Sequence, residues 1–241
     1  FFCFKRSQGA SEAPLMSAMR EAIQNPMFDG TPADDQEQFA FIRHGEAEHN
    51  VLFRMGKIEE GVAIFDPPLT DKGRRQAEAL GRYIEQEQLD FDVIFVSPLL
   101  RALQTARIVF GGFPNSRVVC CPLLSETGMD EVGNVRVGQP CRAGQSPNEL
   151  KTEFHGWDFS QLDDRTVWVE KGGGSQGWAH PDPKEDRVEP FKEYLLNNTL
   201  STDKVAIVGH AAFFQSFVDV KMTSCQMLWK DVTRENAVLT A

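Results

Sequence analysis

Several short runs of apolar residues stop abruptly at polar residues, as buried β-strands do where they end. The first run, FAFI at 39–42, is followed at once by Arg43 and His44. The other runs of this kind are VIFVS at 93–97, RVVCC at 117–121 and KVAIVG at 204–209. Because they are apolar at nearly every position, these runs predict strands that are buried on both faces of a parallel sheet.

Apolar positions at helical spacing lie between these runs and after the last one. A helix is predicted to begin at Thr70, a suitable N-cap after two prolines, and to bury one face made of Ala77, Leu80, Tyr83 and Ile84. A second helix is predicted with Pro98 in its first turn, running on through Leu103, Ala106 and Val109. A third covers AAFFQSFV after His210 and packs its phenylalanines into the core. The alternation predicts an α/β fold, a three-layer α/β/α sandwich around a mostly parallel sheet.

Two parts of the chain break this alternation. Residues 1–37 are rich in Ser, Ala, Pro, Asp and Gln and predict an N-terminal extension that is surface-laid or partly disordered, with one candidate helix around Ser17 to Gln24. Residues 38–241 are then expected to form a single domain with a loop-rich insertion over the site at about 128–188. The aromatic residues of this insertion suit an aromatic wall and core packing equally; they are Trp157, Phe159, Trp168 and Trp178.

The composition is that of a folded domain and narrows the classes of partner. Of 241 residues, 41% are hydrophobic and 25% are charged, which excludes collagen-like, coiled-coil and wholly disordered chains. The net charge of -10 argues against a protein that grips nucleic-acid phosphates over a broad surface. A small basic pocket is still compatible with this charge. We therefore expect a small phosphorylated substrate and no nucleic-acid partner. Whether a protein partner binds the N-terminal extension is left open.

The cysteines and the longest apolar stretches bear on the compartment. The chain has 5 cysteines, at widely scattered positions and without CxxC spacing, so we interpret them as reduced thiols. No apolar run approaches the roughly 18 residues of a transmembrane helix. These observations predict a cytoplasmic protein, or one in an organelle lumen with reducing conditions. Because the sequence begins at Phe1, a removed targeting peptide is left open.

Polar side chains that could bind a ligand or take part in catalysis follow the predicted strands. In a doubly wound sheet, ligands bind beyond the carboxyl ends of the strands. The residues placed there are Arg43, His44, Ser97, Arg101, Glu126 and His210. Two guanidinium groups and two imidazoles around one point are a costly accumulation of positive charge unless a compact dianion occupies it. A phosphoryl group fits that description.

The segments that carry these residues resemble a known family. FIRHGEAEHN resembles the signature of the histidine phosphatase superfamily, in its phosphoglycerate-mutase-like branch 1. Further segments resemble the family's motifs in the same order, namely DPPLTDKGRRQAEAL, SPLLRALQTA, LLSET and VGHAAF. The resemblance spans about residues 39–240 and is specific because five motifs agree in order and spacing. It implies the phosphoglycerate-mutase-like fold.

The resemblance also implies a mechanism and a set of site residues. Neutral His44 would attack phosphorus and form a phosphohistidine, while protonated Glu126 would protonate the departing alkoxide. The catalytic set implied is His44, Glu126, Arg43, Arg101 and His210. The phosphate contacts implied are Arg43, Asn50, Arg101, His210 and the backbone N–H of Ala211. The implied reaction is metal-independent hydrolysis of a phosphomonoester, without a cofactor.

Alternative assignments concern single residues. Asp130 and Glu131 lie near Glu126 and are alternative carboxylates, although the family position favours Glu126. HGEAEH invites a metal site made of His44, Glu46, Glu48 and His49, but histidines five residues apart just past a strand do not have the HExxH spacing. No partner is assigned to His49, His155 or His180, and we interpret them as surface or satisfied core residues.

Alternative functions remain beside the phosphatase hypothesis. One is a non-catalytic scaffold or phospho-ligand-binding member of the same fold, suggested by the N-terminal extension and by Ala211 and Ala212 where the family often has glycine or serine. Another is a phosphoglycerate-mutase-type phosphotransferase. Phosphoglycerate mutases carry ERHYG at the acid, whereas this chain reads SETGMDE, which favours phosphatase action.

Overall fold

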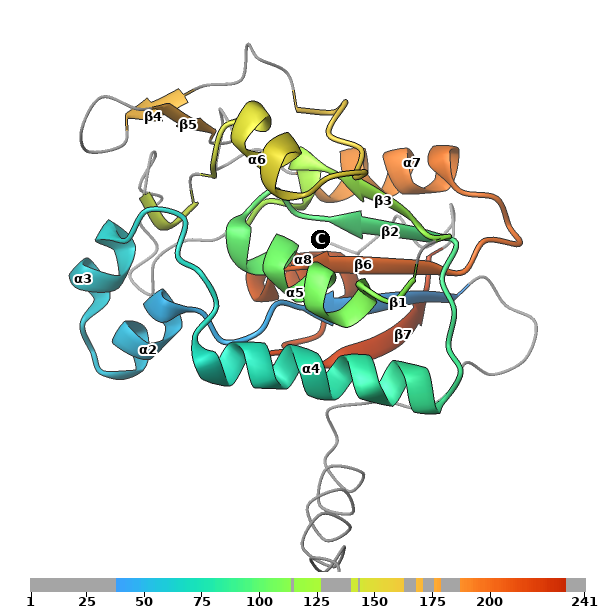
Figure 1. Cartoon of the computed structure of the whole chain (residues 1–241), viewed down its shortest axis with the longest axis horizontal. Coiled ribbons are helices and arrows are strands. Elements are labelled where there is room, and N and C mark those ends of the chain that lie inside the picture. Colours follow the sequence, from blue (N-terminus) through green and yellow to red (C-terminus); the bar gives the residue numbers. More distant parts are fainter. Residues whose placement is uncertain are drawn as a thin grey trace, which may run out of the picture.

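The computed structural model describes residues 38–113, 115–126, 140–142, 144–162, 168–170, 176–178 and 187–232. Its central feature is a 5-stranded sheet in the order β3-β2-β6-β1-β7 (Figure 1). These strands are β1 Gln38–Arg43, β2 Val93–Val96, β3 Arg117–Cys120, β6 Val205–Gly209 and β7 Met227–Asp231. Neighbouring strands are parallel except β1 and β7, which pair antiparallel. The predicted mostly parallel sheet is confirmed.

The parallel register brings polar residues to one edge of the sheet. Arg43 lies opposite Gly209 across β1 and β6. His44, Ser97 and His210 each come directly after the carboxyl end of a strand, so they emerge at this same edge. The edge is the position at which doubly wound sheets bind ligands.

The edge strand β7 was not predicted from the sequence. Met227 and Leu228 are buried, whereas Lys230 and Asp231 are exposed. Its apolar part is therefore too short to give a strand pattern, and only pairing with β1 makes it a strand. The charged residues at its end are typical of edge strands, which avoid pairing with other chains in this way.

Helices cover both faces of the sheet and complete the three layers (Figure 1). The α-helices are α2 Glu48–Arg54, α3 Ile58–Ala63, α4 Asp71–Gln86, α5 Leu100–Phe110, α6 Pro147–Glu153, α7 Val188–Asn198 and α8 Ala211–Val218. Shorter elements are the 3₁₀ helices η1 Pro122–Leu124 and η2 Pro140–Arg142, and the antiparallel pair β4 Trp168–Glu170 and β5 Gln176–Trp178.

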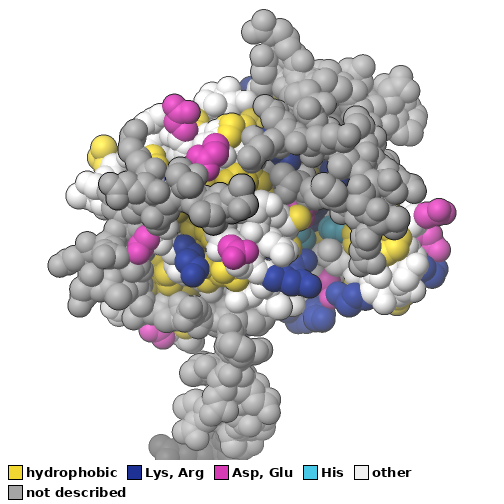
Figure 2. All heavy atoms as spheres, turned by 180° about the vertical axis from the view of Figure 1, so that it is seen from behind, with side chains coloured by type: hydrophobic (Ala, Val, Ile, Leu, Met, Phe, Trp, Pro, Cys, Tyr) yellow, Lys and Arg dark blue, Asp and Glu magenta, His cyan; other side chains and the backbone are white. Residues whose placement is uncertain are grey.

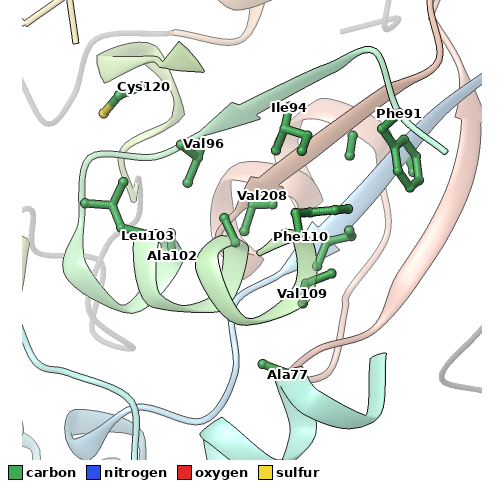
Figure 3. Close-up of a cluster of buried hydrophobic side chains, with 14 of the residues drawn as sticks. Ala77, Phe91, Ile94, Val96, Ala102, Leu103, Val109, Phe110, Cys120 and Val208 are labelled. Carbon is green, nitrogen blue, oxygen red and sulfur yellow. The ribbon is translucent and has the colours of Figure 1, made fainter. Parts of the chain in front are cut away.

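The two faces of the sheet take alternate residues of each strand. On one face, residues such as Ala40 and Ile94 form a core with α4, α5 and α6 (Figure 3). On the other face, Phe41 and Phe95 form a second core with α7 and α8. Because successive strand residues point to opposite faces, burial on both sides requires apolar residues throughout. This is the physical reason for the unbroken apolar runs.

Helix α4 begins as predicted, but α5 does not. The side chain of Thr70 caps α4 by accepting a hydrogen bond from the backbone N–H of Gly73. The prediction that Pro98 lies in the first turn of α5 is wrong, because the N-cap is Leu99 and the helix begins at Leu100. Pro98 therefore belongs to the turn between β2 and α5, where the backbone N–H of Leu99 bonds to Ser97 Oγ. Helix α8 has the predicted bounds.

The described part of the predicted insertion contributes to the core. Helix α6 begins with a capping box in which Ser146 and Glu149 bond to each other's backbone. Phe159 is buried, and the Trp157 ring packs against Phe154 with ring centroids 4.9 Å apart. Of the two alternatives for these aromatics, core packing is therefore correct for Trp157 and Phe159. The side chains of Trp168 and Trp178, the extension at 1–37 and the candidate helix at Ser17 to Gln24 lie outside the described residues.

The described cysteines and helices add two observations. Cys120, Cys121, Cys141 and Cys225 are buried free thiols. Burial raises the pKa of these thiols, which keeps them protonated.

Among the described helices, none has the length and apolar character needed to cross a membrane.

Candidate active site

His44 is the first residue after β1 and is a buried, neutral imidazole. Its Nδ1 lies 2.6 Å from the carbonyl oxygen of Gly45. A carbonyl only accepts hydrogen bonds, so Nδ1 carries the proton and Nε2 carries the lone pair. Burial lowers the pKa of His44 well below its usual value, and the charges of Arg101 and Arg43 lower it further. The ring is thus held as a neutral nucleophile with Nε2 available.

His210 lies beside His44, with ring centroids 5.0 Å apart. Its Nε2 is 2.7 Å from Oγ of Ser97, and both side chains are buried. Burial lowers the pKa of His210 well below its usual value, with a further contribution from Arg101. Its Nδ1 is buried and has no hydrogen-bond partner among the described residues. Ser97 was expected at this edge of the sheet, but no role for it was predicted from the sequence.

The guanidinium groups of Arg43 and Arg101 are each anchored by one backbone carbonyl. Arg43 Nη1 donates a 2.7 Å hydrogen bond to Met222, and Arg101 Nη1 donates one of 3.0 Å to Cys141. Nε of both side chains is buried without a partner among the described residues. Burial lowers the pKa of both groups, and the charge of Glu126 opposes this effect. Buried cations with unused donors form a site that attracts an anion.

Glu126 lies close to both arginines, after η1. Burial raises the pKa of its carboxyl, although Arg101, Arg142, Arg43 and a backbone hydrogen bond from Phe213 oppose this rise. Its Oε1 is buried and unpartnered within the described chain. A carboxyl whose pKa is raised in this way is suited to hold a proton for transfer. Asp130 and Glu131, the alternative carboxylates, lie outside the described residues.

The loop of His44 is held by residues of the two helix-start motifs. The backbone N–H of Gly45 donates to Thr105 Oγ1 at 3.0 Å, and that of Glu46 donates to Gln76 Oε1 at 2.9 Å. The backbone N–H of Thr70 in turn bonds to the carbonyl of Glu46 at 2.9 Å. The polar residues at fixed spacing in DPPLTDKGRRQAEAL and SPLLRALQTA therefore hold the nucleophile loop from two sides.

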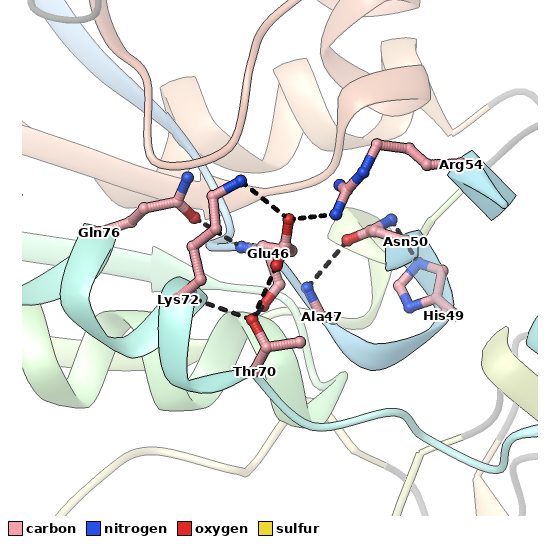
Figure 4. A network of polar contacts seen from close by, with 9 residues as sticks. Glu46, Ala47, His49, Asn50, Arg54, Thr70, Lys72 and Gln76 are labelled. Carbon is pink, nitrogen blue, oxygen red and sulfur yellow. Dashed lines mark hydrogen bonds and ion pairs between the residues drawn. The ribbon is translucent and has the colours of Figure 1, made fainter. Parts of the chain in front are cut away.

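The carboxylate of Glu46 is the centre of a polar network beside this loop (Figure 4). It accepts a hydrogen bond from Thr70 Oγ1 at 3.0 Å and pairs with Arg54 at 2.5 Å and Lys72 at 3.3 Å. Glu46 is only 4% exposed. Burial alone would raise the pKa of this carboxyl, but Thr70, Arg54 and Lys72 together lower it. Glu46 is thus a structural anion.

Asn50 and Ala211, the remaining predicted phosphate contacts, lie at two helix starts. Asn50 Oδ1 accepts from the backbone N–H of Ala47 at 3.0 Å, and its Nδ2 lies 2.9 Å from Nε2 of His49. Ala211 is the first residue of α8, with His210 as the N-cap. The first backbone N–H groups of a helix have no partner within it, so Ala211 presents a donor beside His210.

Two residues at this site, His49 and Arg142, were not predicted from the sequence. His49 is buried at 6% exposure, and its ring centroid is 6.2 Å from that of His44. The charge of Arg142 acts on His49, Arg101 and Glu126, so this guanidinium belongs to the same group of charges. Arg142 had no sequence signal because it lies in the aperiodic insertion. His49 was set aside because a single histidine is more often an ordinary buried or surface residue.

Of the four side chains considered as metal ligands, the two glutamates lie in different environments. Glu48 is exposed, and Glu46 is engaged by Arg54 and Lys72. Within the described residues, no group of three or more His, Cys, Asp or Glu side chains is arranged to hold a metal ion. In Figure 2, histidine side chains are visible between the surrounding residues, and Lys and Arg side chains gather next to them.

The sequence of residues 39–240 matches the model of the histidine phosphatase superfamily, branch 1. The chain belongs to this superfamily. The match covers the elements that carry every predicted site residue, from the end of β1 to the start of α8.

Individual relatives are similar over part of their length. The chain is 32% identical over 135 residues to a probable phosphatase of Schizosaccharomyces pombe, covering 54% of this chain and 56% of that protein. It is 36% identical over 131 residues to fructose-2,6-bisphosphatase TIGAR B of Danio rerio, covering 47% of this chain and 48% of that protein. The chain therefore spans about half the length of the curated relatives that it matches.

Solved structures share the fold at low sequence identity. The ecdysone phosphate phosphatase of the silkworm Bombyx mori superposes with a TM-score of 0.52 at 17% identity, covering 80% of this chain and 88% of that chain. The α-ribazole phosphatase of Shigella flexneri superposes with a TM-score of 0.50 at 20% identity, covering 82% and 92%. The fold of this chain is therefore that of the histidine phosphatases.

Proposed function

We propose that this chain is a metal-independent phosphatase that hydrolyses a small phosphomonoester through a phosphohistidine on His44. The observation that carries the proposal is the state of this ring. Its Nδ1 proton is directed to the Gly45 carbonyl at 2.6 Å, which leaves the lone pair on Nε2. Because burial and two guanidinium groups lower the pKa of His44, the ring is neutral at working pH and needs no separate base.

In the first step, Nε2 of His44 attacks phosphorus in line with the ester oxygen. The N–P bond forms from the ring's lone pair, and the P–O bond to the leaving group breaks with its electron pair on oxygen. The Glu126 carboxyl gives its proton to this oxygen, so the alcohol leaves neutral. The raised pKa of Glu126 supports this role, because the carboxyl must be protonated when the substrate arrives.

In the second step, water attacks the phosphohistidine. The Glu126 carboxylate left by the first step accepts a proton from the water as its oxygen bonds to phosphorus. The P–N bond breaks, its electron pair returns to Nε2, and orthophosphate leaves. His44 and Glu126 are then in their starting states, so the cycle balances as hydrolysis of one phosphomonoester.

The phosphoryl oxygens are held by fixed donors. Arg43 and Arg101 supply the positive charge, and each guanidinium is oriented by a hydrogen bond to a backbone carbonyl. Ser97 Oγ accepts a hydrogen bond from the backbone N–H of Leu99, which favours donation of the hydroxyl proton of Ser97 to Nε2 of His210. The proton of the neutral His210 ring is then on Nδ1, which donates to a phosphoryl oxygen. The backbone N–H of Ala211 adds a helix N-terminus. We place Asn50 at the edge of this group through its Nδ2.

The substrate of this chain is part of the proposal. The relatives' names include phosphatases and a fructose-2,6-bisphosphatase. A site that holds one phosphoryl group among buried cations suits a small phosphorylated molecule, and the reading SETGMDE around Glu126 favours hydrolysis over transfer between phosphoglycerates. The predicted absence of nucleic-acid partners and the predicted compartment stay predictions, as does a protein partner at residues 1–37.

The test is hydrolysis of p-nitrophenyl phosphate with EDTA across pH 4 to 8, combined with trapping of the intermediate. We expect turnover that survives the chelator, is lost in His44→Ala and is unchanged in His155→Ala, a control that removes an exposed histidine. Rapid quenching in alkali followed by mass spectrometry should locate the phosphate on His44. Phosphate on another residue, or turnover that EDTA abolishes, would overturn the proposal.

A further inference from the structure

His49 has a defined tautomer, which the amide of its neighbour Asn50 sets. Asn50 Oδ1 accepts from the backbone N–H of Ala47, which turns the amide nitrogen Nδ2 towards the ring. Nδ2 lies 2.9 Å from Nε2 of His49 and can only donate, so Nε2 accepts. The proton of the neutral ring is therefore on Nδ1. Figure 4 shows Asn50 between Ala47 and His49.

This Nδ1–H is buried and has no hydrogen-bond partner in the part of the chain that the structure describes. The whole residue is only 6% exposed, so bulk water has little access to it. A buried donor without an acceptor is unfavourable, because it has given up its hydrogen bond to water. A bound ligand that supplies the missing acceptor is one way in which folded proteins satisfy such a group.

The surroundings of His49 indicate which ligand this is. Its ring stands edge-to-face against Phe53, with centroids 5.2 Å apart, and 6.2 Å from the ring of His44. The ring of His49 is therefore next to the ring that the proposed mechanism makes the nucleophile. Burial and the charges of Arg101, Arg43 and Arg142 lower the pKa of His49 to about 2. His49 is thus neutral at any working pH and is a donor, not a cation.

We propose that His49 is a further phosphate-binding residue, whose Nδ1–H donates to an oxygen of the phosphoryl group held over His44. The proposal rests on the proposed function of the same site. The phosphoryl group would then contact a neutral donor, His49 of α2, in addition to the cations Arg43 and Arg101. Asn50 then also acts through His49, because one N–H of its amide fixes the tautomer that makes Nδ1 a donor.

The first measurement is the affinity for orthovanadate, a tetrahedral oxyanion, by isothermal titration calorimetry. His49→Phe keeps an aromatic ring against Phe53 and removes both nitrogens. We expect its dissociation constant for vanadate to rise about tenfold, the effect of losing one hydrogen bond to a charged group. His155→Phe makes the same replacement at an exposed position and should bind as the wild type does.

Two polar variants separate the donor from a structural role. In His49→Asn, the amide nitrogen takes the place of Nδ1, but the acceptor for Asn50 is lost. In His49→Gln, the amide oxygen replaces Nε2 as the acceptor for Asn50, but no donor stands at Nδ1. The proposal expects His49→Asn to recover most of the vanadate affinity and His49→Gln to stay as weak as His49→Phe. The reverse order would show that His49 only orients Asn50, and would overturn the proposal.

The outcomes also separate this inference from the proposed function. If wild type forms phospho-His44 and binds vanadate as tightly as His49→Phe does, the inference is wrong and the phosphatase stands. If wild type neither binds vanadate nor forms phospho-His44, both are wrong. Thermal unfolding of each variant shows that it is folded, and an effect on vanadate affinity without a change in the pH profile of turnover agrees with a neutral donor.

Discussion

Gly73, in the first turn of α4, lies against the backbone carbonyl of Glu46, so closely that a Cβ on Gly73 would overlap the carbonyl oxygen. The same contact is tight from the other side, since a Cβ on Gly45 would lie 2.6 Å from the Gly73 oxygen. Two glycines therefore let the nucleophile loop and the start of α4 meet backbone to backbone. The hydrogen bond from Thr70 N–H to Glu46 depends on this approach.

Gly73→Ala is expected to displace the loop of His44. The added methyl group meets backbone, which cannot rotate away, so we expect a loss of about 1–3 kcal/mol in the free energy of unfolding and a lower kcat. Gly112→Ala is the control, because a Cβ on Gly112 would meet no atom within 4 Å. Denaturant unfolding measures both. Equal stability of the two variants would contradict the prediction.

Glu46→Gln is expected to destabilise the protein in a pH-dependent way. Although burial alone would raise it, the pKa of Glu46 is lowered in the folded protein by Thr70, Arg54 and Lys72. A lowered carboxyl pKa stabilises the fold above the unfolded pKa of about 4.5, and this contribution is lost as the pH falls through the folded pKa. Because Arg54 and Lys72 are largely exposed, we expect only about 1–2 kcal/mol at pH 7.

The measurement for Glu46 is the free energy of unfolding of wild type and Glu46→Gln between pH 3 and pH 7. The difference between them should be constant near neutral pH and should shrink below about pH 4.5. Glu48→Gln alters a neighbouring exposed carboxylate and serves as the control. A difference that stays constant down to pH 3 would mean that the charge of Glu46 does not stabilise the fold.

Ser97→Ala is expected to weaken catalysis through His210. The variant removes the 2.7 Å hydrogen bond to Nε2, which selects the tautomer that donates from Nδ1. A single buried hydrogen bond is worth about 0.5–1.5 kcal/mol, so kcat/KM should fall about 2–10-fold. Ser116→Ala removes another serine hydrogen bond, to the Phe91 carbonyl at 2.6 Å, and should leave kcat/KM unchanged. The measurement is steady-state kinetics with p-nitrophenyl phosphate. An equal loss of kcat/KM in both variants would rule out this role of Ser97.

Glu126→Gln is expected to slow turnover in proportion to the basicity of the leaving group. An alkyl phosphate needs a proton for its departing oxygen and should slow by about 10²–10⁴-fold, whereas p-nitrophenolate leaves unaided and should slow much less. Because burial raises the pKa of Glu126, wild-type kcat on the alkyl phosphate should fall on the alkaline side as the carboxyl loses its proton. The variant should lack this fall. Similar losses on both substrates, beside an unaffected Glu193→Gln control, would exclude the acid role.

Much of the fold could be predicted from the sequence because its core strands are buried on both faces. Burial of this kind leaves unbroken apolar runs, and these runs predicted the bounds of β1, β2, β3 and β6 to within one residue. The cap at Thr70 is likewise local, since the side chain bonds to its own helix. The strand β7 left no such pattern, because only its pairing with β1 makes it a strand.

The site, like the fold, could be predicted from the sequence only in part. The sequence by itself determined the residues at the strand ends, since parallel strands bring their carboxyl ends to one edge whatever the loops do. Only the tertiary structure decided the charge states and the tautomer of His210, because these depend on neighbours far away in the chain. Ser97 and His210 are 113 positions apart in the sequence and share a hydrogen bond. The Arg101 guanidinium donates a hydrogen bond to the Cys141 carbonyl. His49 acquires its significance in the same way, since its burial among guanidinium groups has no counterpart in its local sequence.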